Sequence, residues 1–214
     1  MTARGFFVTI DGPSGVGKST TVAEVHRLLG ARGVDASQTV EPSTSGLGEF
    51  IRKYANHFTG RALACLVAAN RYEHVEFEIE PALAGGRTVV CDRYLASTLV
   101  LQRLDGVPEQ YLLDISRDVL LPDLAVILTA SPGLIAERIA TRGVRHRFHL
   151  DPTAPGREVD LYAEAAQSLM SMGVRVLVLD TSDATPTEVA SRIADAVPPP
   201  SVASDATTTP TTNR

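Results

Sequence analysis

The stretch Gly12-Pro13-Ser14-Gly15-Val16-Gly17-Lys18-Ser19 matches the phosphate-binding pattern G-x-x-x-x-G-K-[ST] at every fixed position. Residues 6–10 before it form a short apolar run that is typical of a buried strand. Residues 18–29 after it carry apolar side chains at helical spacing, and we expect this helix to end at Gly30. A strand, a glycine-rich loop and a helix N-terminus in this order direct backbone N–H groups at one point. The stretch therefore predicts a site for a nucleoside triphosphate.

The residue types within this loop suit the parts of a nucleotide. Lys18 would reach the terminal phosphates, and the hydroxyl of Ser19 would ligate Mg²⁺. The alternative is a glycine-rich turn that binds nothing, which is disfavoured because the motif and its flanking elements agree. Lys18 is also one of only two lysines in a chain with 18 arginines. The other residues expected to contact ATP here are Gly12, Pro13, Ser14, Gly15, Val16, Gly17 and Thr20.

Length and composition limit the class of protein. A chain of 214 residues fits one α/β domain, and a formal net charge of −5 without a basic block argues against a nucleic-acid partner. No apolar run approaches the roughly 20 residues that span a bilayer, so we expect no membrane partner. Residues 6–10 are too short for a signal peptide, and we interpret Cys65 and Cys91 as reduced thiols in the core. These features favour a cytoplasmic protein.

Strands and helices alternate along the rest of the chain. Further strands are predicted at 36–40, 88–91, 124–129 and 174–179. Further helices are predicted at 47–58, 61–79, 95–104, 109–120, 132–141, 159–172 and 187–197. The alternation predicts an α/β fold, with helices covering both faces of a parallel sheet. From residue 198 the chain is rich in Pro, Ser and Thr, so we expect one domain over 1–197 and a disordered tail over 198–214.

Polar segments follow two of the predicted strands. Residues 41–46 are rich in turn residues, and Asp92-Arg93-Tyr94 follows the strand at 88–91. The carboxyl ends of parallel strands meet at one edge of a sheet, where ligands bind in open α/β folds. Residues 142–149 contain three arginines, namely Arg142, Arg145 and Arg147. This run is either a solvated surface or a lid, over about 142–157, that covers a site of phosphoryl transfer.

Taken together, these segments resemble the thymidylate kinase family over residues 6–197. The resemblance rests on residues 7–12 with their loop, Glu41-Pro42 leading to 46–48 and Arg52, Ala69-Asn70-Arg71, Asp92-Arg93-Tyr94, and the arginine-rich segment. It implies the fold of P-loop NTPases with a five-stranded parallel sheet, and a homodimer. It also implies phosphorylation of a pyrimidine nucleoside monophosphate that depends on ATP and Mg²⁺, with dTMP as the default acceptor.

The resemblance also implies roles for individual residues. Arg52 and Arg93 would clamp the acceptor phosphate, a role that suits the bidentate guanidinium. Asp92 would hold the water shell of the metal or orient the acceptor, and Lys18, Asp92, Arg93 and Arg147 would be catalytic. The full set expected at the acceptor is Asp11, Glu41, Pro42, Arg52, Val67, Asn70, Arg71, Arg93, Ser97, Thr98, Leu101 and Gln102. The alternatives are a solvated carboxylate at Asp92 and a structural ion pair at Arg93.

The position of the catalytic arginine divides this family. The loop over 12–19 contains no arginine, so the lid must supply it, and Arg147 before Phe148 matches the family motif best. Its role would resemble that of an arginine finger supplied in cis, while Arg142 would contact ATP.

Several positions depart from the family pattern near the acceptor. Val67 stands where a phenylalanine usually stacks on the base, and Leu101 replaces an aromatic residue before Gln102. Ser14 stands where members with a lid arginine carry an acidic residue, and His146 and His149 replace acidic residues of the lid. These changes keep two alternatives open: a kinase of another or modified pyrimidine nucleotide, and a nucleotide-binding module without acceptor kinase activity.

Overall fold

A parallel β-sheet forms the centre of the protein. The computed structural model describes residues 4–142 and 153–199, except for the side chain of Arg142. Five strands pair in the order β2-β3-β1-β4-β5, and every pair is parallel. The strands are β1 (Phe7–Asp11), β2 (Ala36–Val40), β3 (Thr88–Asp92), β4 (Leu124–Thr129) and β5 (Arg175–Asp180). The predicted α/β fold with a five-stranded parallel sheet is confirmed.

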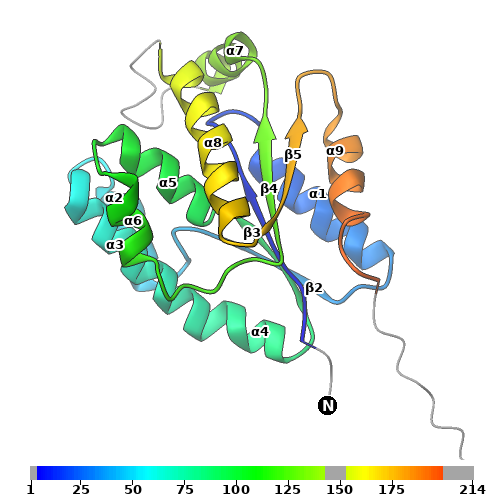
Figure 1. Ribbon diagram of the computed structural model, residues 1–214. Helices are drawn as coiled ribbons and strands as arrows, with labels where there is room; N and C mark the ends of the chain where they lie inside the picture. The colour runs from blue at the N-terminus through cyan, green and yellow to red at the C-terminus, as the bar shows by residue number, and fades with distance from the viewer. Residues whose placement is uncertain (1–3, 143–152, 200–214) are drawn as a thin grey trace, which may run out of the picture.

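Helices cover both faces of this sheet and give it three layers (Figure 1). One face packs against α3, α5 and α8, and the other packs against α1 and α9. The helices are α1 (Lys18–Ala31), α2 (Gly46–Tyr54), α3 (Gly60–His74), the π-helix η1 (Val75–Ile79), α4 (Glu80–Ala84), α5 (Leu95–Leu104), α6 (Glu109–Ile115), α7 (Pro132–Arg142), α8 (Ala154–Ser171) and α9 (Pro186–Ala194).

Side chains alternate between the two faces along the central strands. On β1, Phe7 contributes to the core under α3, α5 and α8, whereas Val8 and Ile10 contribute to the core under α1 and α9. Every residue of β1 and β3 is buried. A strand that is buried on both faces is apolar almost throughout, which is why these strands were recognisable as short apolar runs.

The predicted helix over 61–79 is longer in the structure. The chain stays helical through α3, η1 and α4, from Gly60 to Ala84. Pro81 lies in the first turn of α4, where the missing N–H of proline is not needed and its fixed φ suits a helix. A turn at Gly85 then leads into β3.

Other boundaries also differ from the prediction. The first helix runs through Gly30 to Ala31, and α8 begins at Ala154 rather than at 159, so residues 154–157 are helical. The predicted helices 47–58, 109–120 and 187–197 are shorter at their C-terminal ends. Cys91 is buried as expected, but Cys65 is exposed, because α3 turns that side chain away from the core.

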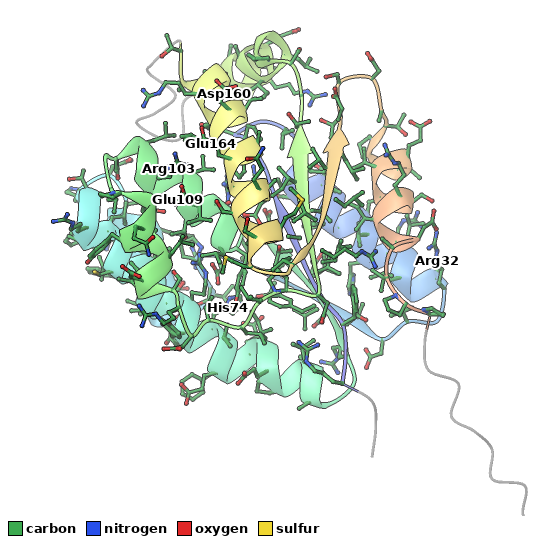
Figure 2. All side chains as sticks on the ribbon, in the orientation of Figure 1. Arg32, His74, Arg103, Glu109, Asp160 and Glu164 are labelled. Atoms are coloured by element: carbon green, nitrogen blue, oxygen red, sulfur yellow. The ribbon has the colours of Figure 1, made fainter. Side chains whose placement is uncertain are left out.

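Ion pairs link α5, α6 and α8 at the surface. Arg103 on α5 lies 2.6 Å from Glu164 on α8 and 3.6 Å from Glu109 on α6, and Figure 2 shows the three side chains together. Such surface ion pairs contribute at most about 1 kcal/mol each, so they add little to the stability of the folded protein. Within the described ranges, no helix is long and apolar enough to cross a membrane.

Candidate active site

The loop between β1 and α1 has the geometry of an anion cradle. Gly12 has a φ of 148°, and a Cβ atom there would lie 2.4 Å from the carbonyl oxygen of Leu128. Gly17 has a φ of 106° at the N-cap of α1, in the left-handed region that favours glycine. The backbone N–H groups of Gly15 and Gly17 have no hydrogen-bond acceptor among the described residues. Free N–H groups at a helix N-terminus are suited to bind phosphate.

Lys18 is held at the mouth of this cradle. Its ammonium group donates hydrogen bonds of 2.7 Å to the carbonyl oxygens of Gly12 and Pro13, which leaves one of its three protons for a ligand. Burial, followed by repulsion from Arg93, lowers the pKa of Lys18 to about 7, against the opposing attraction of nearby carboxylates. An anionic phosphate would favour the charged form of Lys18 again.

Ser19 and Asp92 place two oxygen ligands side by side. The Ser19 hydroxyl donates a hydrogen bond of 2.5 Å to Oδ2 of Asp92. Asp92 is only 7% exposed, and no described residue hydrogen-bonds its Oδ1, so it is not a solvated carboxylate at a strand end. A hydroxyl and a carboxylate with a free oxygen fit Mg²⁺, which prefers oxygen ligands. No cluster of three His, Cys, Asp or Glu residues that could bind a metal occurs in the described residues.

Arg93 follows Asp92 in an unusual backbone conformation. Its φ is 70°, and its half-buried guanidinium forms no ion pair with any carboxylate in the described part of the chain. Its backbone N–H donates to the carbonyl of Ile10 at 3.0 Å. The next N–H, of Tyr94, donates to Asp11 Oδ1 at 2.9 Å. A guanidinium without an anionic partner at this edge is available to a phosphate.

A second arginine, Arg71, is buried at the same edge. Its Nε and Nη2 lie 2.8 and 2.7 Å from Oε2 of Glu41, and Nη2 also donates to Thr98 Oγ1 at 2.7 Å and to the Tyr94 carbonyl at 3.2 Å. No described residue hydrogen-bonds Nη1, although Arg71 is 2% exposed. Buried polar groups are nearly always hydrogen-bonded, so Nη1 indicates a place for a polar ligand atom.

The segment after β2 is fixed to α3 by side chains. Asn70 accepts a hydrogen bond from the backbone N–H of Ser43 at 2.8 Å and donates to its hydroxyl at 2.7 Å. Nη1 of Arg52 on α2 donates to the carbonyl oxygens of Pro42 and Ser43. These contacts fix the segment that begins at Glu41, whose own N–H donates to the carbonyl of Asp92 at 3.0 Å and whose carboxylate pairs with Arg71.

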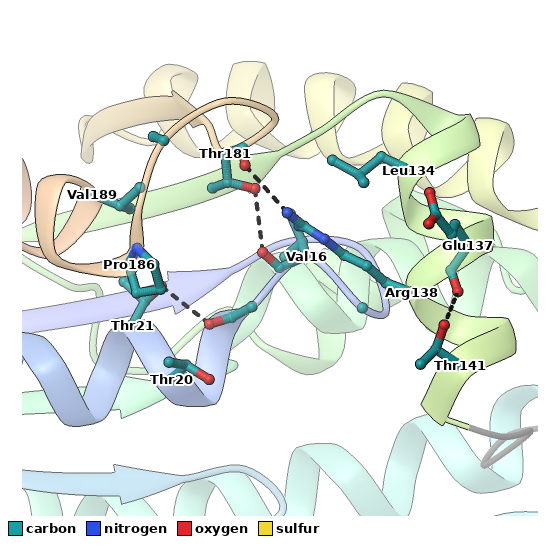
Figure 3. Close-up of a pocket in the computed structure, with 13 residues that line it drawn as sticks. Val16, Thr20, Thr21, Leu134, Glu137, Arg138, Thr141, Thr181, Pro186 and Val189 are labelled. Atoms are coloured by element: carbon teal, nitrogen blue, oxygen red, sulfur yellow. Dashed lines mark hydrogen bonds between the residues drawn. The ribbon is translucent and has the colours of Figure 1, made fainter.

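A cavity of about 490 Å³ opens beside the cradle, between the start of α1, the helix α7 and the segment before α9. Figure 3 shows Val16, Leu134 and Pro186 on its walls, with Arg138 directed at the carbonyl of Thr181, 3.5 Å away. Apolar walls with a few polar groups are typical of a site for a small molecule or a nucleobase.

Comparisons with known proteins agree with this geometry. The family model described as thymidylate kinase matches residues 10–193. The thymidylate kinase of Clavibacter sepedonicus is 35% identical over 82% of this chain and 87% of its own length. The thymidylate kinase of Shouchella clausii is 36% identical over 69% and 74%, and the probable thymidylate kinase of Caldivirga maquilingensis is 35% identical over 66% and 71%. The chain belongs to the thymidylate kinase family. It is therefore an ATP-binding nucleoside monophosphate kinase, a transferase.

The residues that the resemblance to thymidylate kinases assigns to the acceptor site can now be located in the structure. The predicted acceptor residues form two groups of contacts that are adjacent in the chain at Glu41-Pro42. One group joins Arg71 to Glu41 and Thr98, and the other joins Arg52 and Asn70 to residues 42–43. Val67 on α3 and Leu101 on α5 are half-buried, and Gln102 is buried. Asp11 and Ser97 are buried in the interior, where the Ser97 hydroxyl donates to Asp11 Oδ1 at 2.6 Å.

Two residues of α8 at this site had not been predicted from the sequence. Glu158, 2% exposed, accepts a hydrogen bond of 2.7 Å from the backbone N–H of Ser14 in the cradle. The hydroxyl of Tyr162 lies 3.1 Å from that of Ser97. Their helical spacing of four residues was a weak signal, because the predicted lid extended to 157 and the predicted helix began only at 159.

The structure gives no side-chain geometry for the arginines of the predicted lid. Arg145, Arg147, His146 and His149 lie outside the described residues, and Arg142 ends α7 with a side chain that is not described. The assignment of Arg147 as the catalytic arginine and of Arg142 as a contact to ATP therefore stays a prediction.

Proposed function

We propose that this kinase transfers the γ-phosphoryl group of ATP to dTMP, with dTDP and ADP as products. The observation that carries the proposal is the contact between Ser19 and Asp92, because it joins the phosphate cradle to the turn that carries Arg93. A donor site and a cationic acceptor site therefore lie at one edge of the sheet. The names of the relatives, which are thymidylate kinases, support dTMP as the acceptor.

On the donor side, the cradle would hold the phosphates of ATP and the 490 Å³ cavity would hold its base. The free N–H groups of Gly15 and Gly17 and the remaining proton of Lys18 are the phosphate ligands. Mg²⁺, when bound, would neutralise charge on the transferred group, held by the Ser19 hydroxyl and by Asp92 through water.

On the acceptor side, Arg93 would bind the monophosphate, together with those nitrogens of Arg52 that do not contact loop carbonyls. The unpartnered Nη1 of Arg71 would donate to a carbonyl oxygen of the base. An acceptor phosphate oxygen then attacks the γ-phosphorus, and the bond from that phosphorus to the oxygen bridging to the β-phosphate breaks. The attacking oxygen is already anionic, so no general base is needed and catalysis is positioning plus charge neutralisation.

The aliphatic side chains of Val67 and Leu101 favour one alternative acceptor. They are half-buried and cannot stack on a base as an aromatic ring does, so they leave space for a pyrimidine with a larger substituent. A kinase of a modified pyrimidine nucleotide is therefore the second candidate.

One further feature of the proposal comes from the family resemblance. We propose a homodimer, to which the exposed aromatic rings of Tyr72 and Phe77 would contribute. The single kinase domain over 1–197 and the cytoplasmic location stay predictions.

A coupled assay of ADP release tests the acceptor. The wild-type chain is incubated with ATP, Mg²⁺ and one monophosphate from a panel of dTMP, dUMP, UMP, CMP, dCMP and modified pyrimidines. The proposal predicts that dTMP raises ADP release at least tenfold over ATP alone. Turnover with another pyrimidine but not with dTMP would assign the alternative acceptor. Slow turnover that no monophosphate stimulates would indicate a nucleotide-binding module.

A further inference from the structure

Arg93 has a backbone conformation that is costly for its residue type. It is the one non-glycine residue with a positive φ in the described ranges, at 70°. Left-handed backbone is unfavourable at a residue with a side chain, and glycine would avoid this strain. Such strain persists only where the surrounding contacts determine the conformation. The contacts that hold the Arg93 backbone in this conformation therefore help to orient its guanidinium group.

The last two residues of β1 supply these contacts. The N–H of Arg93 is bound by the carbonyl of Ile10, and the following N–H, of Tyr94, is bound by Oδ1 of Asp11. The peptide groups on both sides of the Arg93 Cα atom are thus fixed to one strand.

Asp11 binds more than this one group. Its Oδ1 also accepts from the N–H of Ser97 at 2.9 Å and from the Ser97 hydroxyl at 2.6 Å. Tyr94 is the N-cap residue of α5, and its own side chain makes no capping hydrogen bond. A carboxylate from β1 therefore takes the place of an N-cap side chain at this ten-residue helix. Asp11 is completely buried, and this burial raises its pKa against the lowering effect of the three hydrogen bonds.

We propose that Asp11 is a positioning residue that fixes Arg93 for the acceptor phosphate by capping α5, and that it acts through Arg93 rather than by contact with metal or acceptor. This inference rests on the proposed role of Arg93 in binding the acceptor. Asp11 also directly precedes Gly12, so one side chain ties the acceptor clamp to the start of the phosphate cradle. Its Oδ2 has no described hydrogen-bond partner, which makes direct contact with a ligand the competing explanation.

Two substitutions at Asp11 separate these explanations. Asp11→Asn keeps an acceptor oxygen for the three hydrogen bonds but loses the charge, whereas Asp11→Ala loses both. The KM for the acceptor, the KM for ATP, kcat and the Mg²⁺ concentration for half-maximal rate are measured for each. If Asp11 is a positioning residue, the acceptor KM of Asp11→Asn should stay within about fivefold of the wild-type value, and that of Asp11→Ala should be at least tenfold higher than wild type. The KM for ATP should change less than twofold in both variants. If Asp11 contacts a ligand directly, Asp11→Asn should raise the acceptor KM as much as Asp11→Ala does, and it should need a higher Mg²⁺ concentration for half-maximal rate. That result would overturn the proposal.

A double-mutant cycle tests whether Asp11 acts through Arg93. If it does, Asp11→Ala adds no further increase in acceptor KM once Arg93→Ala is present. Independent, additive effects of the two substitutions would contradict the proposal. If Asp11→Ala does not fold, Ser97→Ala replaces it, because it removes one of the three bonds. We then expect an acceptor KM raised about threefold and again no added effect on Arg93→Ala.

The controls separate this inference from the proposed function. Asp160→Asn makes the same chemical change at an exposed aspartate of α8, visible in Figure 2, and should leave every parameter at the wild-type value. Wild-type chain that turns over no monophosphate would refute the proposed function. Wild-type activity with an acceptor KM that is unchanged in Asp11→Ala would refute the positioning role alone.

Discussion

At the carboxyl edge of the sheet, several buried charged side chains have hydrogen-bonding atoms that are available to a ligand. Lys18 donates two of its protons to loop carbonyls, and within the described ranges neither Nη1 of Arg71 nor Oδ1 of Asp92 has a hydrogen-bond partner. Leaving such groups unsatisfied costs about 1–3 kcal/mol each, so a bound ligand that completes them gains affinity. These groups are therefore available to hydrogen-bond the phosphate and acceptor that we propose.

Lys18→Ala should abolish transfer while the protein stays folded. Lys18 faces the phosphate cradle, so its loss removes stabilisation of the transition state more than it removes packing. Cationic and oxyanion-stabilising groups of this kind contribute roughly 10²–10⁵ in rate. Steady-state kinetics and circular dichroism of the purified variant check this, and a kcat above a tenth of the wild-type value would contradict the assignment.

Arg93→Gly should separate stability from activity. Glycine adopts a φ of 70° without strain, so we expect Arg93→Gly to be about 1 kcal/mol more stable than the matched control Arg93→Ala. Both variants should raise the acceptor KM, because both remove the guanidinium. Urea denaturation measures the difference in stability, and a glycine variant less stable than the alanine variant would show that the backbone at Arg93 is unstrained.

Single elements show how far the sequence alone can predict this protein. The strands were predicted to within one residue at each end. The strands β1, β3 and β4 are buried, and buried parallel strands are short apolar runs between turn residues. The end of the helix over 61–79 was wrong, since Pro81 is compatible with the first turn of α4 after a π-helix. The contribution of α8 was not predicted, because Glu158 reaches Ser14 of the cradle, and Tyr162 reaches Ser97, only through tertiary packing.

Val67 on α3 gives a prediction about the acceptor pocket. If dTMP is the acceptor, Val67→Phe adds a stacking contact of about 1–3 kcal/mol and should lower the KM for dTMP by up to about tenfold. If the natural acceptor carries a bulkier base, phenylalanine fills that space and abolishes its use. The KM values of Val67→Phe for dTMP and for a bulkier pyrimidine monophosphate decide between these two outcomes. Val67→Leu is the control, because it adds volume without an aromatic ring.

At the scale of the whole molecule, the phosphate cradle and the proposed acceptor residues lie at one edge of a sheet that is covered by helices on both faces. The cavity beside the cradle, the Ser19–Asp92 contact and the Arg71–Glu41 pair come from segments far apart in the sequence. β1 and β3 bring them together, since each ends at this edge. The phosphate cradle and the proposed acceptor site are therefore linked through two paired strands.

The exposed aromatic surface gives a prediction about assembly. Phe77 is 73% exposed on η1, which is unusual for so large an apolar side chain. We expect light scattering to give twice the chain mass of 22.8 kDa, and Phe77→Asp to weaken the dimer. A monomer at micromolar concentration in the wild type would contradict the proposed homodimer.

The most direct test of the central claim follows the phosphoryl group itself. The wild-type chain is incubated with Mg²⁺, dTMP and ATP labelled at the γ-phosphate, and the nucleotides are separated. The account predicts that the label appears in dTDP in amounts equal to the ADP formed, and that Lys18→Ala produces neither. Label that appears only as inorganic phosphate, or a dTMP pool that stays unlabelled while ATP is consumed, would contradict it.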